Sequence, residues 1–485
     1  MTKPQHVPLP QNVDPLRWVT RRSFLGRTSA GLGTIALASL LDSSTQAEEN
    51  DSVGALPGLH FAPKAKRVIY LFMSGAPSHV DLFDPKPELN DMHGKPLPQS
   101  VRGKERLTLM TRSQAEHLCA RATAMFSHRG ACGMELSDLL PHIGGIADQI
   151  CLVRSMYTEP INHDPAVTFM QTGSPQAGRP CMGSWLTYGL GSDNADLPAF
   201  VVLLSGHTNQ PLLSRYWHSG FLPSRHQGVQ FRSQGDPVLY LSNPNGLDGA
   251  GRGRIVEAVN ALNRIKSKQV LDPEIEGRID SFELAYRMQS SVPELMDLSG
   301  EPASVRERYG VDETPGSFAA NCLLARRLAE RGARFIQLYH AGWDQHLRLR
   351  KDIRRQCRQT DRATAALITD LKERGMLDDT LVVWGGEFGR TSYTQGKQDD
   401  SGGRDHHAGC FSIWLAGGGI RGGTVYGSTD AFGYNVAERP VHTHDLQATI
   451  LHLLGIDHER MTYRFKGRDF RLTDVSGQVV EEIIT

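Results

Sequence analysis

The sequence has little that would mark a cysteine-based zinc protein, a nucleic-acid-binding protein or a membrane-spanning protein. Its seven cysteines are scattered over 485 residues without C-x-x-C spacing, so a zinc–cysteine site is not expected, although one disulfide could form in an oxidising compartment. Lys+Arg and Asp+Glu both number 53, so no net charge attracts nucleic acid or anionic lipid. Beyond residue 47, no segment reaches about 18 uninterrupted apolar residues, so we expect no permanent membrane span.

Two common catalytic fingerprints are also missing. The sequence contains no G-x-S-x-G nucleophile elbow. The glycine-rich turns at 385–386 and 417–419 do not give G-x-G-x-x-G at the start of a helix. Ser78, His79 and Asp81 supply the residue types of a hydrolytic triad, but neighbours along a chain do not normally converge as a triad requires. A serine hydrolase or a dinucleotide-binding enzyme is therefore not expected.

The N-terminus has the features of a twin-arginine export signal. Residues 20–25 read Thr-Arg-Arg-Ser-Phe-Leu, and 29–41 form an uncharged, weakly apolar stretch that is too short to span a bilayer. Small residues at 44–47 suit a cleavage site. We expect residues 1–47 to be a signal peptide and residues 48–485 to be exported already folded, by the twin-arginine machinery, to the periplasm or the cell exterior. The alternative is an ordinary amphipathic helix with a chance arginine pair.

Short apolar runs alternate with longer helical patterns, which predicts an α/β fold with a mostly parallel central sheet flanked by helices. The predicted strands are 67–73, 149–153, 200–204, 334–339, 380–384 and 411–416. The predicted helices are 254–265, 274–289, 317–330, 353–374 and 445–454. The stretch 205–253 is rich in Gly, Pro, Ser, Asn and Arg, and we interpret it as a long, loop-rich excursion over the carboxyl edge of the sheet. A disordered insertion is the alternative.

Acidic residues and histidines gather at the ends of these strands. Asp344 and His346 follow the fourth predicted strand, Glu387 follows the fifth, and His406 and His407 precede the sixth. Because parallel strands deliver side chains to one edge of a sheet, we expect the first three and at least one of the two adjacent histidines to reach a single metal ion. This mixture of nitrogen and oxygen ligands suits zinc, manganese or iron. Solvated turns and supporting histidines are the alternatives.

The same regions resemble a known family. Residues 71–87, which include Ser74-Gly75-Ala76-Pro77-Ser78-His79, are similar to the opening signature of the domain of unknown function family 1501. Further similar motifs are Asn162-His163, Trp343-Asp344-Gln345-His346, Gly386-Glu387-Phe388-Gly389-Arg390, Asp405-His406-His407 and the closing run 445–455. These motifs cover nearly all of the chain after the signal, and in order, so the sequence is identified as a member of that family.

The family in turn resembles the alkaline phosphatase and sulfatase superfamily. This resemblance implies an alkaline phosphatase/sulfatase-like sheet with a divalent metal ion (zinc, manganese, iron or calcium) at its carboxyl edge, and hydrolysis of sulfate or phosphate esters. Residues 163–173 fit the spacing of the sulfatase signature, with His163 at the position of the Cys or Ser nucleophile and Val167 at that of the arginine. The resemblance therefore implies that His163, as a further ligand or a general base, and Arg390 are the catalytic candidates.

Three functions remain open from the sequence. The first is a metal-dependent hydrolase of sulfate or phosphate esters, polysaccharide esters included, that lacks the usual nucleophile. The second is a non-catalytic protein that binds sulfated or phosphorylated glycans, and the third is a different metal-dependent reaction. If His163 occupies the nucleophile position, it begins a helix at the rim of the sheet and faces Asp344. A helix N-terminus would disfavour the charged form of its ring.

The export signal generates the first prediction. Replacing Arg21 and Arg22 with lysines keeps the positive charge but removes the residues that the export receptor reads. We expect the Arg21→Lys, Arg22→Lys precursor to accumulate in the cytoplasm, as measured by immunoblotting of cell fractions. Normal recovery of the mature protein outside the cytoplasm would contradict the export assignment.

Overall fold

The computed structural model describes residues 54–103, 107–206, 212–233, 236–238, 248–270, 273–312 and 314–485. The predicted signal peptide over residues 1–47 lies outside the described residues.

The apolar runs of the sequence form the middle of a nine-stranded sheet. At its centre, β1 (Arg67–Ser74) lies between β7 (Phe335–Ala341) and β8 (Thr380–Gly385), and all three run parallel. Beyond β7, β5 (Phe200–Gly206) and β6 (Val229–Phe231) continue the parallel order. Every residue of β7 and β8 is buried, as expected for parallel strands that are covered on both faces.

One strand on the other side of β8 reverses direction. β11 (Phe411–Ala416) pairs antiparallel with β8 and with β4 (Ile150–Tyr157). β12 (Thr424–Tyr426) and β15 (Val441–His442) then pair in parallel with β4. The sheet is therefore mixed but mostly parallel, which confirms the predicted α/β fold.

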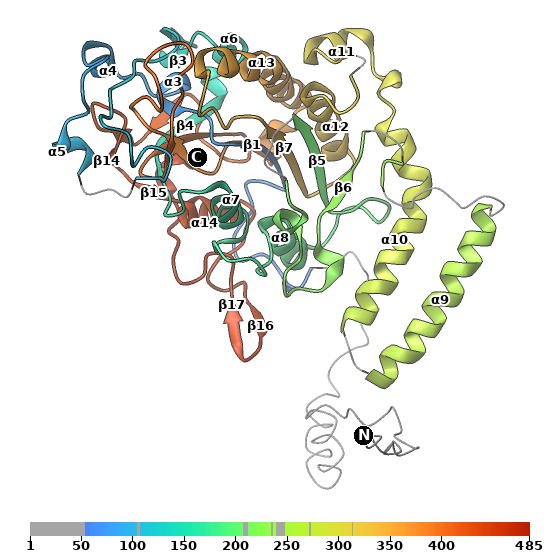
Figure 1. Ribbon diagram of the computed structural model, residues 1–485. Helices are drawn as coiled ribbons and strands as arrows, with labels where there is room; N and C mark the ends of the chain where they lie inside the picture. Colours follow the sequence, from blue (N-terminus) through green and yellow to red (C-terminus); the bar gives the residue numbers. More distant parts are fainter. Residues whose placement is uncertain are drawn as a thin grey trace, which may run out of the picture. The chain divides into compact units, whose positions relative to one another are not determined.

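Helices cover both faces of this sheet (Figure 1). α12 (Phe318–Glu330) and α13 (Leu349–Glu373) pack on one face, and α8 (Met182–Leu190) and α14 (Thr443–Leu453) pack on the other. The alternation of side chains along β1 (Arg67–Ser74) serves both layers, since its odd-numbered apolar residues join one buried cluster and its even-numbered ones join the other.

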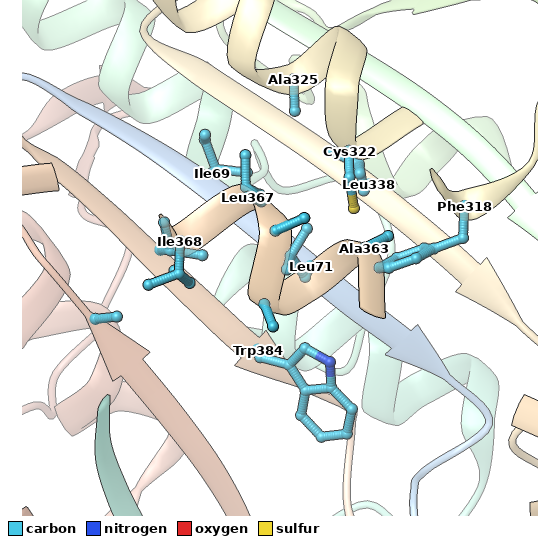
Figure 2. Close-up of a cluster of buried hydrophobic side chains, with 14 of the residues drawn as sticks. Ile69, Leu71, Phe318, Cys322, Ala325, Leu338, Ala363, Leu367, Ile368 and Trp384 are labelled. Atoms are coloured by element: carbon cyan, nitrogen blue, oxygen red, sulfur yellow. The ribbon is translucent and has the colours of Figure 1, made fainter. Parts of the chain in front are cut away.

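Figure 2 shows the first of these two clusters. Leu71 and Leu338 of adjacent strands lie beneath Cys322 and Leu367, which come from the two covering helices. All four side chains are completely buried. Each Å² of apolar surface that they bury contributes about 25 cal/mol to the free energy of folding. This packing stabilises the positions of the strands whose ends carry the polar residues.

The region between β5 and α12 departs most from the sequence-based expectations. The stretch 205–253 contains the edge strand β6 (Val229–Phe231), which the pattern did not predict. Two long helices follow, α9 (Gly249–Val270) and α10 (Pro273–Met296), and each is longer than predicted. None of the helices among the described residues combines the length and apolar composition needed to cross a membrane. The seven cysteines all lie in the described residues, and no disulfide joins any two of them there.

The turn after β1 brings two loops into direct contact. Gly75 has φ +107°, and a Cβ at this position would overlap the backbone of Trp343 and Asp344. The residue after it, Ala76, also has a positive φ of 63°. Glycine is required at position 75 because only a residue without a side chain fits both the backbone conformation and the close approach.

Gly75→Ala tests this contact against a matched control. Gly133 also has a positive φ, 69°, but a Cβ there would meet nothing within 4 Å. Both substitutions introduce backbone strain, and only the first adds overlap, so we expect Gly75→Ala to lose roughly 1–3 kcal/mol more stability than Gly133→Ala. Thermal unfolding of the two purified variants measures the difference. Equal destabilisation would show that the two loops are not held in contact.

Candidate metal centre

Four side chains that lie far apart in the sequence meet beside the carboxyl ends of the parallel strands. They are His163, Asp344, His346 and His406, and one possible ligand atom from each lies within 4.8 Å of the others. The Oδ1 atom of Asp344 is 2.9 Å from Nε2 of His346, 3.1 Å from Nε2 of His163 and 3.5 Å from Nε2 of His406. We call this group the histidine–aspartate cluster.

Strand direction explains why these residues converge. Asp344 and His346 follow the end of β7, and α7 (His163–Thr172) follows the end of β4. β11 runs against its neighbours, so His406, which precedes that strand, reaches the same edge as residues that follow the others. The sheet thereby collects ligand candidates from three separate segments of the chain.

All three imidazole rings turn Nδ1 away from the cluster and onto an oxygen acceptor. The pairs are His163 with Oε1 of Glu387 at 2.5 Å, His346 with Oε1 of Gln395 at 2.6 Å, and His406 with the carbonyl of Ile161 at 2.7 Å. Because these oxygens only accept, each Nδ1 donates, and in a neutral ring Nε2 then carries a bare lone pair. This is how metal-ligating histidines are held in proteins.

The bare nitrogens face one another. Nε2 of His346 and Nε2 of His406 are 2.9 Å apart, and two lone pairs at this distance repel unless a cation lies near both. Nε2 of His163 is buried and faces Oδ1 of Asp344 at 3.1 Å. Three nitrogen donors and one carboxylate oxygen therefore surround a point that suits a metal ion, and the residues present fit the metal that the sequence predicted.

Burial and charge act against each other in the cluster. Burial lowers the pKa of His406 to about 4 against the opposing effect of Asp344, so this ring is neutral near pH 7. Burial disfavours the ionised form of Asp344, but hydrogen bonds with the three histidines and the charge of Arg390 hold its pKa well below the usual range.

His163 shows the opposite balance. Burial alone would lower its pKa, but hydrogen bonds with Asp344 and Glu387 outweigh burial and raise it. The lowering expected from a helix N-terminus is therefore wrong, because two carboxylates flank the ring. A proton and a metal ion are alternative ways of placing positive charge between His163 and Asp344.

The position of His163 agrees with the sequence-based prediction. It is the first residue of α7 and faces Asp344 at the rim of the sheet. Its neighbour Asp164 accepts a hydrogen bond from Tyr216 at 3.0 Å and pairs with Arg215. The start of the helix is thus held by the partners of both His163 and Asp164. The Nε2 atom of His163 joins the cluster as a fourth ligand candidate.

Arg390 is buried behind Asp344, with 1% of its side chain exposed. Its Nη2 donates to Oδ1 of Asp344 at 2.7 Å and to the carbonyl of Gly75. Its Nε donates to the carbonyl of Ala76 at 3.0 Å, and its Nη1 donates to the carbonyl of Arg404 at 3.2 Å. Since all three nitrogens have acceptors inside the protein, we infer that this predicted catalytic residue positions Asp344.

Two predicted metal ligands lie outside the cluster. Glu387 is fully buried behind His163, and it accepts hydrogen bonds from that ring and from the backbone N–H of Gly75 at 3.0 Å. His406 and His407 form the short strand β10, where successive side chains point to opposite sides. His407 therefore faces away and contacts the carbonyl of Tyr434 at 2.6 Å.

The adjacent Ser78, His79 and Asp81 have structural roles. Asp81 forms a buried ion pair with Arg404 at 2.7 Å and accepts the Ser78 hydroxyl at 2.5 Å. His79 contacts the carbonyl of Gly433 at 2.9 Å, and burial lowers its pKa to about 4. None of the three belongs to the cluster, in agreement with the expectation that they form no triad.

Gln395 and Ile161 escaped the sequence analysis. Each supplies the oxygen that holds one ring of the cluster. Ile161 acts through its backbone carbonyl, which leaves no side-chain signature. Gln395 stands in a polar loop with no motif around it, and the only signal available was its proximity to the predicted ligands in sequence.

Comparisons with known proteins agree with the family resemblance. A family model described as "Protein of unknown function (DUF1501)" matches residues 65–484. A search of curated proteins found no match. Similar solved structures are sulfatases and members of the alkaline phosphatase superfamily.

Three of these structures show how low the sequence identity and the structural similarity are. The PsFucS1 sulfatase from Pseudoalteromonas sp. is 13% identical, with a TM-score of 0.36 over 81% of this chain and 68% of its own. A Vibrio parahaemolyticus protein of the alkaline phosphatase superfamily is 11% identical, with a TM-score of 0.34 over 84% and 73%. The TAB5 alkaline phosphatase is 10% identical, with a TM-score of 0.33 over 82% and 99%.

The two neighbouring histidines of β10 provide a matched test of the cluster. Glutamine retains a hydrogen-bonding side chain but does not replace imidazole as a ligand for a first-row metal. We expect His406→Gln to lose bound metal, by at least about tenfold in occupancy or affinity, and His407→Gln to retain it. Elemental analysis of the two purified proteins measures this. Equal metal content in both would remove His406 from the centre.

Proposed function

The chain belongs to the DUF1501 family, and we propose that it is an exported, metal-dependent hydrolase of sulfate or phosphate esters. The observation that supports this most is the convergence of three bare imidazole nitrogens on the carboxylate of Asp344. His163, Asp344, His346 and His406 would hold the ion. When bound, the metal supplies a Lewis acid that polarises an ester oxygen and lowers the pKa of water.

The ligand set restricts the identity of the metal. Calcium takes oxygen ligands, so a centre with three imidazole nitrogens fits calcium poorly. Zinc usually has four ligands, and the four side chains of the cluster would fill its shell. Manganese and iron take more ligands, and their remaining positions stay open to water and substrate. Ester hydrolysis at this centre therefore favours manganese or iron.

The protein around the cluster suits an anionic ester. The N-terminus of α7 (His163–Thr172) lies at the cluster, and the partial positive charge of a helix N-terminus favours a bound oxyanion. Arg390 fixes the orientation of Asp344, and Glu387 fixes the ring of His163. The position given to a nucleophile by the sulfatase resemblance holds His163, whose Nε2 faces Asp344, so we assign the attack on the ester to water.

Export is the second part of the proposal. The motif at residues 20–25 and the small residues at 44–47 support transport by the twin-arginine machinery and a periplasmic or extracellular site of action. Sulfated polysaccharides are one source of suitable esters in that compartment.

A second function follows from the same four ligands. If the ion is zinc, the cluster closes its coordination shell, as in structural zinc sites. The protein would then bind sulfated or phosphorylated glycans without hydrolysing them. Metal identity and turnover together separate the two functions.

The decisive experiment uses protein purified from its own host. We expect about one equivalent of manganese or iron per chain, and release of sulfate or phosphate from an aryl ester. Both should disappear on chelation, and hydrolysis should return when the same metal is added. One zinc ion without turnover would favour the binding function, and protein free of metal would contradict both.

A further inference from the structure

One face of helix α9 carries a row of exposed apolar side chains. Ile255 is 51% exposed, Leu262 is 68% exposed and Ile265 is 58% exposed, and the exposed Ala258 lies between the first two. Their spacing of three, four and three residues places all four on one side of an α-helix. We call these four residues the apolar stripe.

The apolar stripe faces away from α10, which lies alongside α9 (Figure 1). The side chains of Asn260 and Arg264 both donate to Oε1 of Glu283 on α10, at 2.9 Å and 3.0 Å. Leu262 lies two residues from each of these donors, and a separation of two residues corresponds to about 200° around a helix. The contact with α10 therefore leaves the apolar stripe on the opposite side of α9.

Basic residues border the apolar stripe on both edges. Arg254 precedes Ile255 and Lys266 follows Ile265, so the two basic residues lie on opposite edges of the stripe. Both are exposed, and neither has an ion-pair partner among the described residues. The sequence of α9 has five basic residues against one acidic residue, namely Arg252, Arg254, Arg264, Lys266 and Lys268 against Glu257. The balanced charge of the whole chain therefore conceals a local excess of positive charge.

We propose that α9 lies in the surface of an anionic lipid bilayer, with the apolar stripe among the acyl chains and Arg254 and Lys266 at the headgroup phosphates. A helix with one apolar face and basic residues along its edges suits this position, because the burial of apolar area and the attraction to anionic lipid add. Long basic side chains reach from the edge of the apolar face to the headgroups. The protein would thus be attached peripherally to a membrane, independently of the metal centre and of the proposed function.

A second copy of the chain suits the apolar stripe less well. In an antiparallel pair of α9 helices that matches the stripe with itself, Ile255 lies opposite Ile265, and Arg254 then lies opposite Lys266. In a parallel pair in register, each basic residue lies opposite its own copy. Like charges repel in both arrangements, whereas lipid phosphates attract them. The charge pattern therefore favours a bilayer over a dimer.

The experiment measures cosedimentation with lipid vesicles, using protein purified from its own host. Vesicles of phosphatidylglycerol and phosphatidylcholine in equal parts provide an anionic bilayer, and vesicles of phosphatidylcholine alone provide a neutral one. We expect the partition coefficient to be about a hundredfold higher on the anionic vesicles, because each basic residue near an anionic surface strengthens binding several-fold. Added salt should reduce this difference.

Two double variants separate the apolar and the charged contributions. The Leu262→Ser, Ile265→Ser variant loses apolar area, so its partition coefficient on anionic vesicles should fall by at least about tenfold. The Arg254→Gln, Lys266→Gln variant loses positive charge, so its preference for anionic over neutral vesicles should fall by about tenfold.

A matched control tests for a general loss of surface hydrophobicity. Met125 is 75% exposed and Val475 is 79% exposed, and both lie outside α9. The Met125→Ser, Val475→Ser variant should bind both kinds of vesicle as the wild type does. All four proteins have the same N-terminus, so differences between them come from the substituted side chains. Circular dichroism and elution volume in size-exclusion chromatography are recorded for each protein.

Three results would overturn the proposal. If the wild type binds neither kind of vesicle, or if the Leu262→Ser, Ile265→Ser variant binds as the wild type does, α9 does not enter a bilayer. Loss of binding in the charge variant alone assigns α9 to a soluble polyanion instead. A dimeric wild type that ignores vesicles and becomes monomeric in the apolar variant assigns the stripe to a second copy. The proposed hydrolase stands or falls separately, by its metal and its turnover.

Discussion

The candidate centre depends on one buried cation, the guanidinium of Arg390. Its donors bind the loop after β1, the loop after β7 and the backbone of Arg404, and the carboxylate of Asp344 is the one anion among these partners. An uncompensated buried charge costs several kcal/mol, so these loops cannot separate without leaving Arg390 unpaired. The same bond that neutralises Arg390 orients Asp344 toward the histidines. The close approach at Gly75 and the shape of the cluster are consequences of this constraint.

The sequence was sufficient for the sheet and for much of the centre. Fully buried parallel strands appear as short, continuous apolar runs, and β1 and β8 were predicted almost to their observed ends. Asp344 and His346 could be placed together because they lie two residues apart in one short segment. The antiparallel direction of β11 has no local signature, since it arises from pairing with β8 and β4. That direction nevertheless decides that residues before this strand reach the cluster.

The remaining details depend on contacts that a single chain segment does not encode. The two-residue strand β10 is too short for an alternating pattern, so the sequence could not tell His406 from His407. Glu387 was expected to bind the ion directly. The imidazole ring of His163, more than two hundred residues earlier in the chain, lies between Glu387 and the cluster and occupies the nearer position. The oxygen that holds His406 is a backbone carbonyl, which any residue could supply.

The four candidate ligands lie far apart along the chain, and this separation determines at what stage of folding, and in which compartment, a metal ion can bind. His163 and His406 are more than two hundred residues apart in the chain. Their Nε2 atoms meet only after β4, β7 and β11 have been assembled in one sheet. An unfolded chain therefore has no preformed site, and metal capture must accompany or follow folding. A protein that leaves the cytoplasm folded would take its ion from the cytoplasmic pool. Under the proposed export, the selection of one metal over another would then reflect the supply inside the cell, even though the ion would be used outside it.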